Sequence, residues 1–395
     1  MFTHLLKMLW NKRRANGLIF LEILLSFFVL FGVFAFFTYN LDRYRSPLGM
    51  ESEDRVGIRV DLPDGLDSLA AMELQERIKR DLLAIPAVRN ASWLGPINPF
   101  GYSNWNSHIQ NDTMSIRTMM MFADHDYAQT LAIPMTEGRW FTSADYGGKY
   151  QPVVVNKAFK DDLFPDRDGL VGLKFDMNGI SWEIVGVTGD FKYLSNFAEN
   201  EPLTFFPQIH MMAGKDKEPF EMMILELAPN SLGATEETIY NQLVQATKST
   251  DVVIWDMEKD RRKANRSTVI PIVILLIISG FLLVNIALGL FGVLFTQIGR
   301  RRAEIGLRKA LGASAGEVTT QFILELLIVA GSALLLGTFF AIQVPLLELT
   351  PLPGRYFYLG IVGAVITVLV LVVVCSLIPS RQAAGLHPAL VLHED

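Results

Sequence analysis

The residue types that most often carry catalysis or metal binding are spread along this chain without a useful spacing. The six histidines lie at His4, His108, His125, His210, His387 and His393. They do not form the H-E-x-x-H pattern or any other spacing that puts two ligands on one helix face. His125 stands between Asp124 and Asp126 and could touch a metal ion, but a histidine in an exposed turn is the favoured interpretation. The sequence therefore predicts neither a metal site nor a catalytic histidine.

The chain also lacks the loop with which a protein holds nucleotide phosphates. That loop reads G-x-x-x-x-G-K-[ST], and both Gly148-Lys149 and Gly214-Lys215 lack its upstream glycine and its following Ser or Thr. Adjacent acids such as Asp161 and Asp162 point in different directions on a helix, which is typical of ordinary surface. We therefore expect no catalytic residue, and no cofactor bound directly by this chain.

Two acidic residues, Glu22 and Glu325, interrupt stretches that are otherwise apolar. Such acids are functional candidates, because a charge is costly inside a lipid bilayer. Both lie near the end of the apolar stretch where basic residues gather. Each carboxylate can therefore snorkel, or pair with Arg13, Arg14 or Lys309. Structural pairing is favoured over a role in proton transfer.

The segment with the clearest pattern is basic and reads Arg-Arg-Arg-Ala-Glu-Ile-Gly-Leu-Arg-Lys-Ala-Leu-Gly-Ala-Ser over residues 300–314. It predicts a short amphipathic helix in which Ile305, Leu307 and Leu311 make apolar contacts, with Gly312 as a natural stop. The first three arginines alone would suffice as an anchor beside a membrane. A whole helix can also dock into a groove of another protein.

Four long apolar stretches must position these residues. They cover residues 17–39, 269–299, 322–343 and 357–379, and the mean hydropathy of the chain is +0.30. A run of about 20 residues spans the ~30 Å hydrocarbon core of a bilayer, whereas core helices of a soluble protein have shorter apolar runs and a polar face. The first stretch is too long for a signal peptide, and no small-x-small cleavage site follows it. We therefore predict an integral membrane protein with four transmembrane helices.

Lysine and arginine indicate the orientation. They precede the first apolar stretch, gather between the second and third, and follow the fourth at Arg381, whereas the loop between the third and fourth has only Arg355. Both termini and the basic segment are thus predicted in the cytoplasm, with residues 40–266 outside the bacterial inner membrane. Acidic residues outnumber basic ones in this outer segment, which argues against nucleic-acid binding. The single cysteine, Cys375, lies in the fourth apolar stretch, so a hydrophobic core must stabilise the outer domain without a disulfide.

The outer segment reads as two strand–helix–strand units with a β-rich stretch between them. In the first unit, a strand from Arg55 precedes a helix that Asp67 or Ser68 can cap, and a strand at Val88–Leu94 follows. The second unit has strands at 221–227 and 251–256 around a helix at 235–247. Two such units predict a ferredoxin-like α+β layer. A charged helical stalk at Met257–Arg266 is expected to continue into the second transmembrane helix.

Residues 299–314 resemble the signature loop of FtsX-like/MacB-like permeases, the membrane subunits of type VII ABC transporters. Similar residues stand in that family at Leu283-Val-Asn-Ile, Gln321-Phe-Ile-Leu-Glu325 and Ile378-Pro-Ser-Arg-Gln-Ala-Ala-Gly-Leu-His-Pro-Ala-Leu. Outer segments that follow the family's order are Ile133-Pro-Met-Thr-Glu-Gly-Arg-Trp-Phe, Val153-Val-Val-Asn-Lys-Ala, Leu163-Phe-Pro, Gly169-Leu-Val-Gly and Glu183-Ile-Val-Gly-Val-Thr-Gly-Asp-Phe. The resemblance covers nearly the whole chain and is most specific in residues 280–395.

The resemblance implies a division of the chain into membrane and outer parts. These are a cytoplasmic N-terminus (1–16), a first transmembrane helix (17–39), a MacB-like outer core domain (40–266), a stalk with the second transmembrane helix (257–298), a coupling-helix loop (299–316), two further transmembrane helices (318–343 and 357–379) and a cytoplasmic C-terminus (380–395). Within the core domain, residues 50–98 and 208–256 would be porter-like, and residues 99–207 a β-rich, sabre-like insert.

In that family the coupling helix contacts an ABC ATPase, which binds ATP and magnesium. Two permease copies pair, and ATP-driven closure moves the outer domains in a process called mechanotransmission. The residues that the resemblance assigns to coupling are Arg301, Arg302, Glu304, Ile305, Gly306, Leu307, Arg308, Lys309, Leu311 and Gly312. We expect Glu304 and Arg308 to lie against the ATPase. Because the chain has no fused ATPase, that protein is expected to be a separate subunit.

The resemblance leaves several alternatives open. Export or extrusion of hydrophobic or amphiphilic cargo leads, since the large two-part outer domain favours it over a signal transducer that activates a cell-wall hydrolase or a sensor kinase. A membrane-anchored binding protein without an ATPase is disfavoured by the coupling-type loop. The cargo, a homodimer or heterodimer, and a periplasmic adaptor or outer-membrane channel stay undecided. So does the packing of the first helix, which is rich in phenylalanine at Phe20, Phe27, Phe28, Phe31, Phe34, Phe36 and Phe37.

Overall fold

The computed structural model describes residues 13–384, with gaps at 64, 102, 104, 112–113, 146–147, 178 and 208–220. Most of the predicted cytoplasmic N-terminus, the start of the second porter-like part and the end of the C-terminal segment therefore lie outside the described residues. The chain forms two compact units, one of Met1–Asp42 with Val269–Asp395 and one of Arg43–Thr268. The first consists of helices and is called the helical unit. The second is built on a sheet and is called the outer unit, after the predicted outer segment, nearly all of which it contains.

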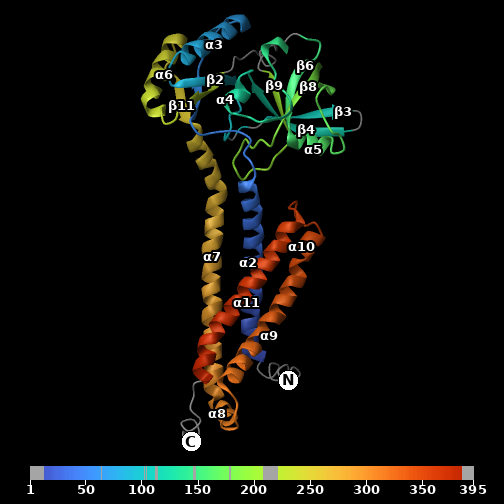
Figure 1. Cartoon of the computed structure of the whole chain (residues 1–395), viewed down its shortest axis with the longest axis vertical. Coiled ribbons are helices and arrows are strands. Elements are labelled where there is room, and N and C mark those ends of the chain that lie inside the picture. The colour runs from blue at the N-terminus through green and yellow to red at the C-terminus, as the bar shows by residue number, and fades with distance from the viewer. Residues whose placement is uncertain are drawn as a thin grey trace. The chain divides into compact units, whose positions relative to one another are not determined.

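Among the described residues, four helices are long and apolar enough to cross a membrane, as the sequence predicts (Figure 1). They are α2 (Arg13–Arg45), α7 (Met257–Arg300), α9 (Ala315–Ala341) and α11 (Gly354–Ala384). A short helix, α8 (Arg302–Ala310), joins α7 to α9, and α10 (Gln343–Leu346) lies between α9 and α11. Helices α9 and α11 pack against each other along much of their length.

Glycines on α9 and α11 accommodate the phenylalanines of α2. A Cβ atom at Gly337 of α9 would lie 2.5 Å from Cδ1 of Phe27, and one at Gly363 of α11 would lie 3.0 Å from the ring of Phe34. Phe27 is fully buried. Because apolar side chains gain little from leaving lipid, close packing of this kind is the main force that holds transmembrane helices together. Phe27 and Phe34 of α2 thus pack directly against the backbone of α9 and α11. They can do so because Gly337 and Gly363 have no side chain.

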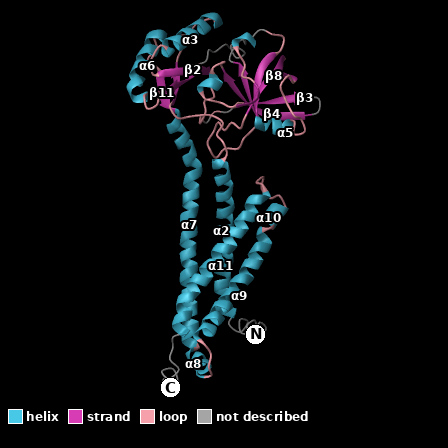
Figure 2. Ribbon diagram, in the orientation of Figure 1, coloured by secondary structure: helices cyan, strands magenta, loops and turns pink. Residues whose placement is uncertain are grey.

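The described strands of the outer unit form an eleven-stranded sheet (Figure 2). Its main path runs β11-β1-β10-β2-β4-β9-β6-β8-β5, with β3 paired to β4 and β7 paired to β8. The strands are β1 (Arg55–Val60), β2 (Val88–Leu94), β3 (Asn106–Asn111), β4 (Met114–Ala123), β5 (Met135–Gly138), β6 (Gln151–Asn156), β7 (Lys174–Met177), β8 (Ile180–Thr188), β9 (Leu203–Pro207), β10 (Met222–Leu227) and β11 (Val252–Asp256).

The first four strands of this path confirm the ferredoxin-like layer. Strands β11, β1, β10 and β2 are antiparallel neighbours, and the helices α3 (Ser68–Leu83) and α6 (Leu232–Thr247) each connect two of them. This is the order expected when two strand–helix–strand units interleave. Asp67 caps α3, since its carboxylate accepts a hydrogen bond from the Ala70 N–H at 2.8 Å. Figure 2 shows α3 and α6 beside each other on this part of the sheet.

The β-rich stretch at 99–207 extends the same sheet. Strands β2 and β4 are joined through a single residue pair, Leu94 with Ala123. Strand β9 then runs parallel to β4, and β6 runs parallel to β8. The short helices in this part are α4 (Tyr127–Thr130), the 3-10 turn η1 (Ser143–Asp145) and α5 (Lys157–Leu163). One hydrophobic core lies on each face, because neighbouring residues such as Met223 and Ile224 point to opposite sides of a strand.

A buried ion pair links α3 to the loop after β4. The ammonium of Lys79 lies 2.8 Å from Oδ2 of Asp124 and also contacts Asp126. Asp124 in turn accepts hydrogen bonds from the hydroxyl of Ser92 and the backbone N–H of Trp93. His125 therefore lies between two acids that already bind the ammonium of Lys79. Its side chain is 35% exposed. These contacts hold α3 and β2 to the loop after β4.

Replacing Lys79 with methionine should destabilise the outer unit by about 3 kcal/mol, because Asp124 would remain buried without its cation. Burial disfavours the charged ammonium, but Asp124 and Asp126 outweigh this and raise the pKa of Lys79 above its ordinary 10.5. The stability that the raised pKa of Lys79 contributes is therefore fully present below that ordinary value, as far as Asp124 stays ionised, and it is lost as the pH rises through the raised pKa.

The measurement is thermal unfolding of the full chain in detergent, followed by tryptophan fluorescence. A cost of this size lowers the midpoint by about 6–12 °C. The control is Lys157→Met, at an exposed position of α5, for which the change should stay within about 0.5 kcal/mol. Equal unfolding midpoints for the two variants would contradict a stabilising role for Lys79.

Candidate functional site

The basic segment folds as α8 between two sharp changes of direction. Arg301 separates it from α7, and Leu311 and Gly312 end it. Gly312 has a φ of +100°, and the N–H of Ala313 donates to the carbonyl of Arg308 at 3.0 Å. Glycine is favoured there because other side chains clash in this conformation. The next helix, α9, starts with a capping box between Ser314 and Glu317, which fixes where the chain turns back.

A buried arginine–glutamate pair holds α8 against α9. Nη1 of Arg301 lies 3.0 Å from both carboxylate oxygens of Glu325, and each of the two side chains is only 9% exposed. The guanidinium also lies 5.4 Å above the ring of Phe322. The sequence offered Lys309, Arg13 or Arg14 as partners of a snorkelling acid. Glu325 instead takes Arg301, because the turn before α8 brings that residue onto α9.

Three further polar side chains extend the pair along α8. Glu304 accepts from Nε of Arg301 at 2.9 Å and from Nη2 of Arg308 at 2.7 Å. Gln321 accepts from Nη1 of Arg308 at 2.5 Å and donates to Glu325 at 3.1 Å. Each charge in this polar network therefore meets an opposite charge or an amide, which offsets the cost of removing it from water.

Helix α8 thus has an inner and an outer face. Arg301, Ile305 and Gly306 are buried, and Ile305 joins the apolar core of the helical unit. Glu304, Arg308 and Lys309 are half-buried. Arg302, Leu307, Leu311 and Gly312 are exposed, with exposed fractions of 55% for Leu307 and 80% for Leu311. The ten residues expected to act together therefore divide into an anchoring set and an exposed set.

The second intramembrane acid, Glu22, packs against a glycine of α7. A Cβ atom at Gly289 would lie 2.7 Å from Oε2 of Glu22, so the carboxylate lies where any larger residue would collide. The side chains of Arg13 and Arg14, its expected partners, lie outside the described residues. Glu22 and Glu325 therefore differ in surroundings, and only Glu325 joins the polar network of α8.

In the outer unit, the start of α7 is tied to the sheet by charged side chains. Oδ1 of Asp256, the last residue of β11, accepts from the N–H of Glu258 at 2.9 Å. Glu258 binds Arg261 at 2.7 Å, Arg262 at 3.0 Å and the hydroxyl of Ser52 at 2.9 Å. A strand and a helix thus follow each other without a flexible linker between them.

One loop, residues 191–197, binds both helices where they enter the outer unit. The buried ammonium of Lys192 contacts the carbonyl of Arg43 and lies 2.6 Å from the hydroxyl of Ser46, at the end of α2. Asn196 exchanges two hydrogen bonds with Asn265 of α7, at 2.9 and 3.0 Å. Sequence reasoning missed this loop, because its partners lie far away along the chain. A lysine directly after the Gly-Asp-Phe segment was the only available signal.

Two family models match the chain. The model of the MacB-like periplasmic core domain matches residues 20–251, and the model of the FtsX-like permease C-terminal domain matches residues 276–388. The first covers more than half of the chain, and the second includes α8 with its polar network.

Several known permeases are similar to the chain. YvrN, an uncharacterized ABC transporter permease of Bacillus subtilis, is 25% identical over 284 residues, which are 69% of each chain. The macrolide export ATP-binding/permease protein MacB of Escherichia coli K12 is 21% identical over 329 residues, 82% of this chain and 50% of MacB. This chain thus spans about half the length of that relative. The periplasmic region of MacB from Actinobacillus actinomycetemcomitans has a TM-score of 0.40 at 12% identity, over 54% of this chain and 94% of that one.

Replacing Glu325 with alanine should release α8 from α9, because the buried Arg301 guanidinium would keep only the half-exposed carboxylate of Glu304, on α8 itself. The expected cost is about 3 kcal/mol, and amide hydrogen exchange in α8 should quicken more than about tenfold. The charge swap Arg301→Glu with Glu325→Arg should restore part of the protection. The control is Arg300→Ala, at an exposed neighbouring position. If α8 exchanged equally fast in Glu325→Ala and Arg300→Ala, the pair would not be its anchor.

Proposed function

Because the chain belongs to the family of ABC transporter permeases with a MacB-like periplasmic core domain and an FtsX-like C-terminal domain, we propose that a separate ABC ATPase drives it. The chain would be the membrane subunit of the pair, and ATP with magnesium would bind the ATPase alone. Its own contribution would be mechanical, with no catalytic residue.

The observation that carries this proposal is the two-faced helix α8. Its inner face is fixed by the Arg301–Glu325 pair, so that a force applied to α8 is passed on to α9 instead of bending a loop. Its outer face presents Leu307 and Leu311, one helical turn apart, with Arg302 nearby. Apolar residues at this spacing are what a helix uses to enter a groove of a partner. We assign the outer face to the ATPase, together with Glu304 and Arg308, whose side chains are 40% and 42% exposed beside it.

Helix α7 is the natural path for movement beyond α8. It is a single helix of 44 residues, with Pro271 inside it, from Met257, the residue after β11, to Arg300, the residue before Arg301. At 1.5 Å per residue this is about 66 Å of continuous helix. Loop 191–197 couples it to the end of α2 within the outer unit. This arrangement supports mechanotransmission, in which ATP hydrolysis moves the outer domains.

The cargo class and the assembly are also part of the proposal. MacB, one of them, is named for macrolide export, which favours hydrophobic or amphiphilic cargo here. We place the chain in the bacterial inner membrane with both termini in the cytoplasm, paired with a second permease copy that is either identical or a paralogue. A periplasmic adaptor and an outer-membrane channel would complete an export path.

Changing Leu307 and Leu311 together to aspartate should break the complex with the ATPase, because two carboxylates would have to enter an apolar groove. We expect permease-stimulated ATP hydrolysis to fall more than about tenfold, while α8 keeps its inner contacts. The measurement is the ATPase rate of the co-purified complex in nanodiscs, together with recovery of the ATPase in a pull-down of the tagged permease.

The matched control is Leu347→Asp with Leu349→Asp, two exposed leucines after α10. This control should insert and bind the ATPase normally. If the α8 variant recovered as much ATPase as the control, the outer face would not be the docking surface. A native complex without any nucleotide-binding subunit would overturn the proposed function as a whole.

A further inference from the structure

The two ends of the sheet's main path are protected very differently. At one end, β5 has an irregular register between Met135 and Glu137, its Gly138 has a φ of +63°, and Glu137 binds Lys160. Bulges and inward charges of this kind prevent the pairing of an edge strand with another chain. At the other end, β11 reads Val-Val-Ile-Trp-Asp, and it pairs with β1 in a regular register. Among the described strands, β1 is its only neighbour.

The outward-facing backbone groups of β11 can be identified from its pairing. The N–H of Asp61 donates to the carbonyl of Asp251, so residue 251 faces β1. In an antiparallel pair the backbone groups of successive residues point to alternate sides. Those of Val253 and Trp255 therefore face β1, and those of Val252 and Ile254 face away from the sheet. The outer edge of β11 thus offers N–H and C=O groups at a two-residue spacing.

A groove runs beside this edge, between β11 and the first turns of α6. A cavity of about 570 Å³ is lined by Val252, Val253 and Ile254 of the strand and by Gly233, Glu236, Glu237 and Tyr240 of the helix. Val253 is 40% exposed, and both glutamates are exposed. The groove therefore has an apolar side formed by the strand and an acidic side formed by the helix.

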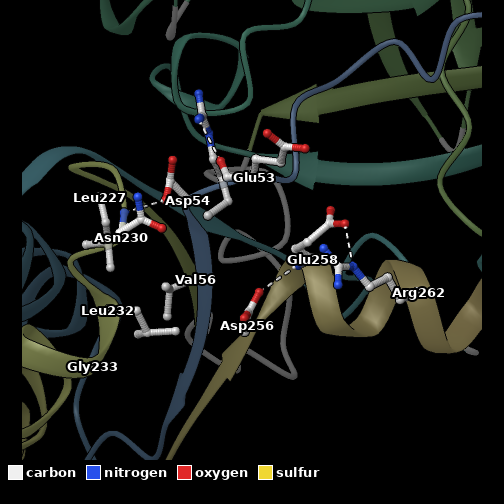
Figure 3. A pocket seen from close by; sticks show the side chains of 11 residues that line it. Glu53, Asp54, Val56, Leu227, Asn230, Leu232, Gly233, Asp256, Glu258 and Arg262 are labelled. Atoms are coloured by element: carbon white, nitrogen blue, oxygen red, sulfur yellow. Dashed lines mark hydrogen bonds and ion pairs between the residues drawn. The ribbon is translucent and has the colours of Figure 1, made fainter.

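The acidic lining continues into a second cavity of about 540 Å³, which shares Gly233 with the first (Figure 3). Its carboxylates come from Glu53, Asp54, Asp256 and Glu258. The two arginines in its lining are already engaged. Arg262 binds Glu258 at 3.0 Å, and Arg55 donates to the carbonyls of Thr130 and Glu53. Glu258 is likewise paired, with Arg261 and Arg262. The negative charge of the two cavities therefore comes from Glu236 and Glu237 in the first and from Glu53, Asp54 and Asp256 in the second.

We propose that the edge of β11 binds an extended segment of a partner protein, one with lysine or arginine at alternate positions. The segment adds a strand to the sheet through the outward backbone groups of Val252 and Ile254. Its basic side chains meet Glu236 and Glu237 in the first cavity, and its far end reaches the acids of the second. The intervening apolar side chains pack on Val253 and Tyr240.

Charge complementarity favours such a partner over a second copy of this chain. Pairing of two β11 edges about a twofold axis would bring Glu236 and Glu237 of both copies close together, and like charges across paired strands are destabilising. The β11 site belongs to the outer unit and α8 to the helical unit. The proposed binding does not use the ATPase, so its failure would leave the proposed function untouched.

The test uses the full chain in a non-ionic detergent and a fluorescein-labelled peptide of four Lys-Val repeats. Fluorescence anisotropy should show saturable binding that weakens with salt, and a peptide of four Glu-Val repeats should not bind. The variant Glu236→Lys with Glu237→Lys should weaken binding by about tenfold or more. The matched control is Asp161→Lys with Asp162→Lys, an adjacent exposed pair on α5, and it should bind the peptide unchanged.

A second peptide separates strand addition from simple charge attraction. N-methylation of the four central Lys-Val residues removes their backbone donors and keeps their charge, so binding should be lost. Undiminished binding of this peptide would overturn the proposal. Equal weakening in the two double variants, or the absence of saturable binding to the unmodified peptide, would overturn it as well.

Discussion

The structure of the helical unit depends on one buried ion pair, Arg301 with Glu325. A lone carboxylate on an apolar helix is costly, and so is a lone guanidinium that is 91% removed from solvent. The two groups can be buried only as a pair. This pairing requires the chain to turn sharply after α7, so that Arg301 and the start of α8 lie against α9. Glu304, Arg308 and Gln321 then find partners around the pair. The two exposed leucines of the outer face, Leu307 and Leu311, are positioned as a consequence.

At the other end of α7, polar contacts join the helix to the sheet of the outer unit. Asp256 and Glu258 use short polar contacts to join β11 to the helix without a linker, and loop 191–197 ties α7 to the end of α2. The loop relies on a fully buried lysine whose ammonium is surrounded by backbone carbonyls and a hydroxyl. In the proposed mechanism, these contacts are where movement of a long helix becomes movement of the sheet.

Much of this architecture could be predicted from the sequence, because the signals are local. Long apolar stretches predicted the four long helices, and Asp67 or Ser68 was the predicted cap of α3, which Asp67 provides. A strand was predicted at Val88–Leu94, and these are the bounds of β2. The pairing of Glu325 with Arg301 could not be predicted. The sequence offered Arg13, Arg14 or Lys309 as partners, and the turn at Arg301 that brings its guanidinium to Glu325 forms only in the completed fold. The Phe27–Gly337 contact and the Asn196–Asn265 bonds likewise join residues far apart in sequence, whose meeting depends on the completed fold.

The central claim, that α7 transmits movement as one continuous helix, is tested most directly by interrupting it. Three glycines inserted between Arg266 and Ser267 would uncouple its two parts and leave α8 intact. The measurement is the distance between spin labels at Asp161→Cys in two permease copies, in a Cys375→Ala background, with the ATPase present and with or without ATP and vanadate. The account predicts a nucleotide-dependent shift in the uninterrupted protein, and none in the glycine variant despite continued ATP hydrolysis. An unchanged shift in the glycine variant would contradict it.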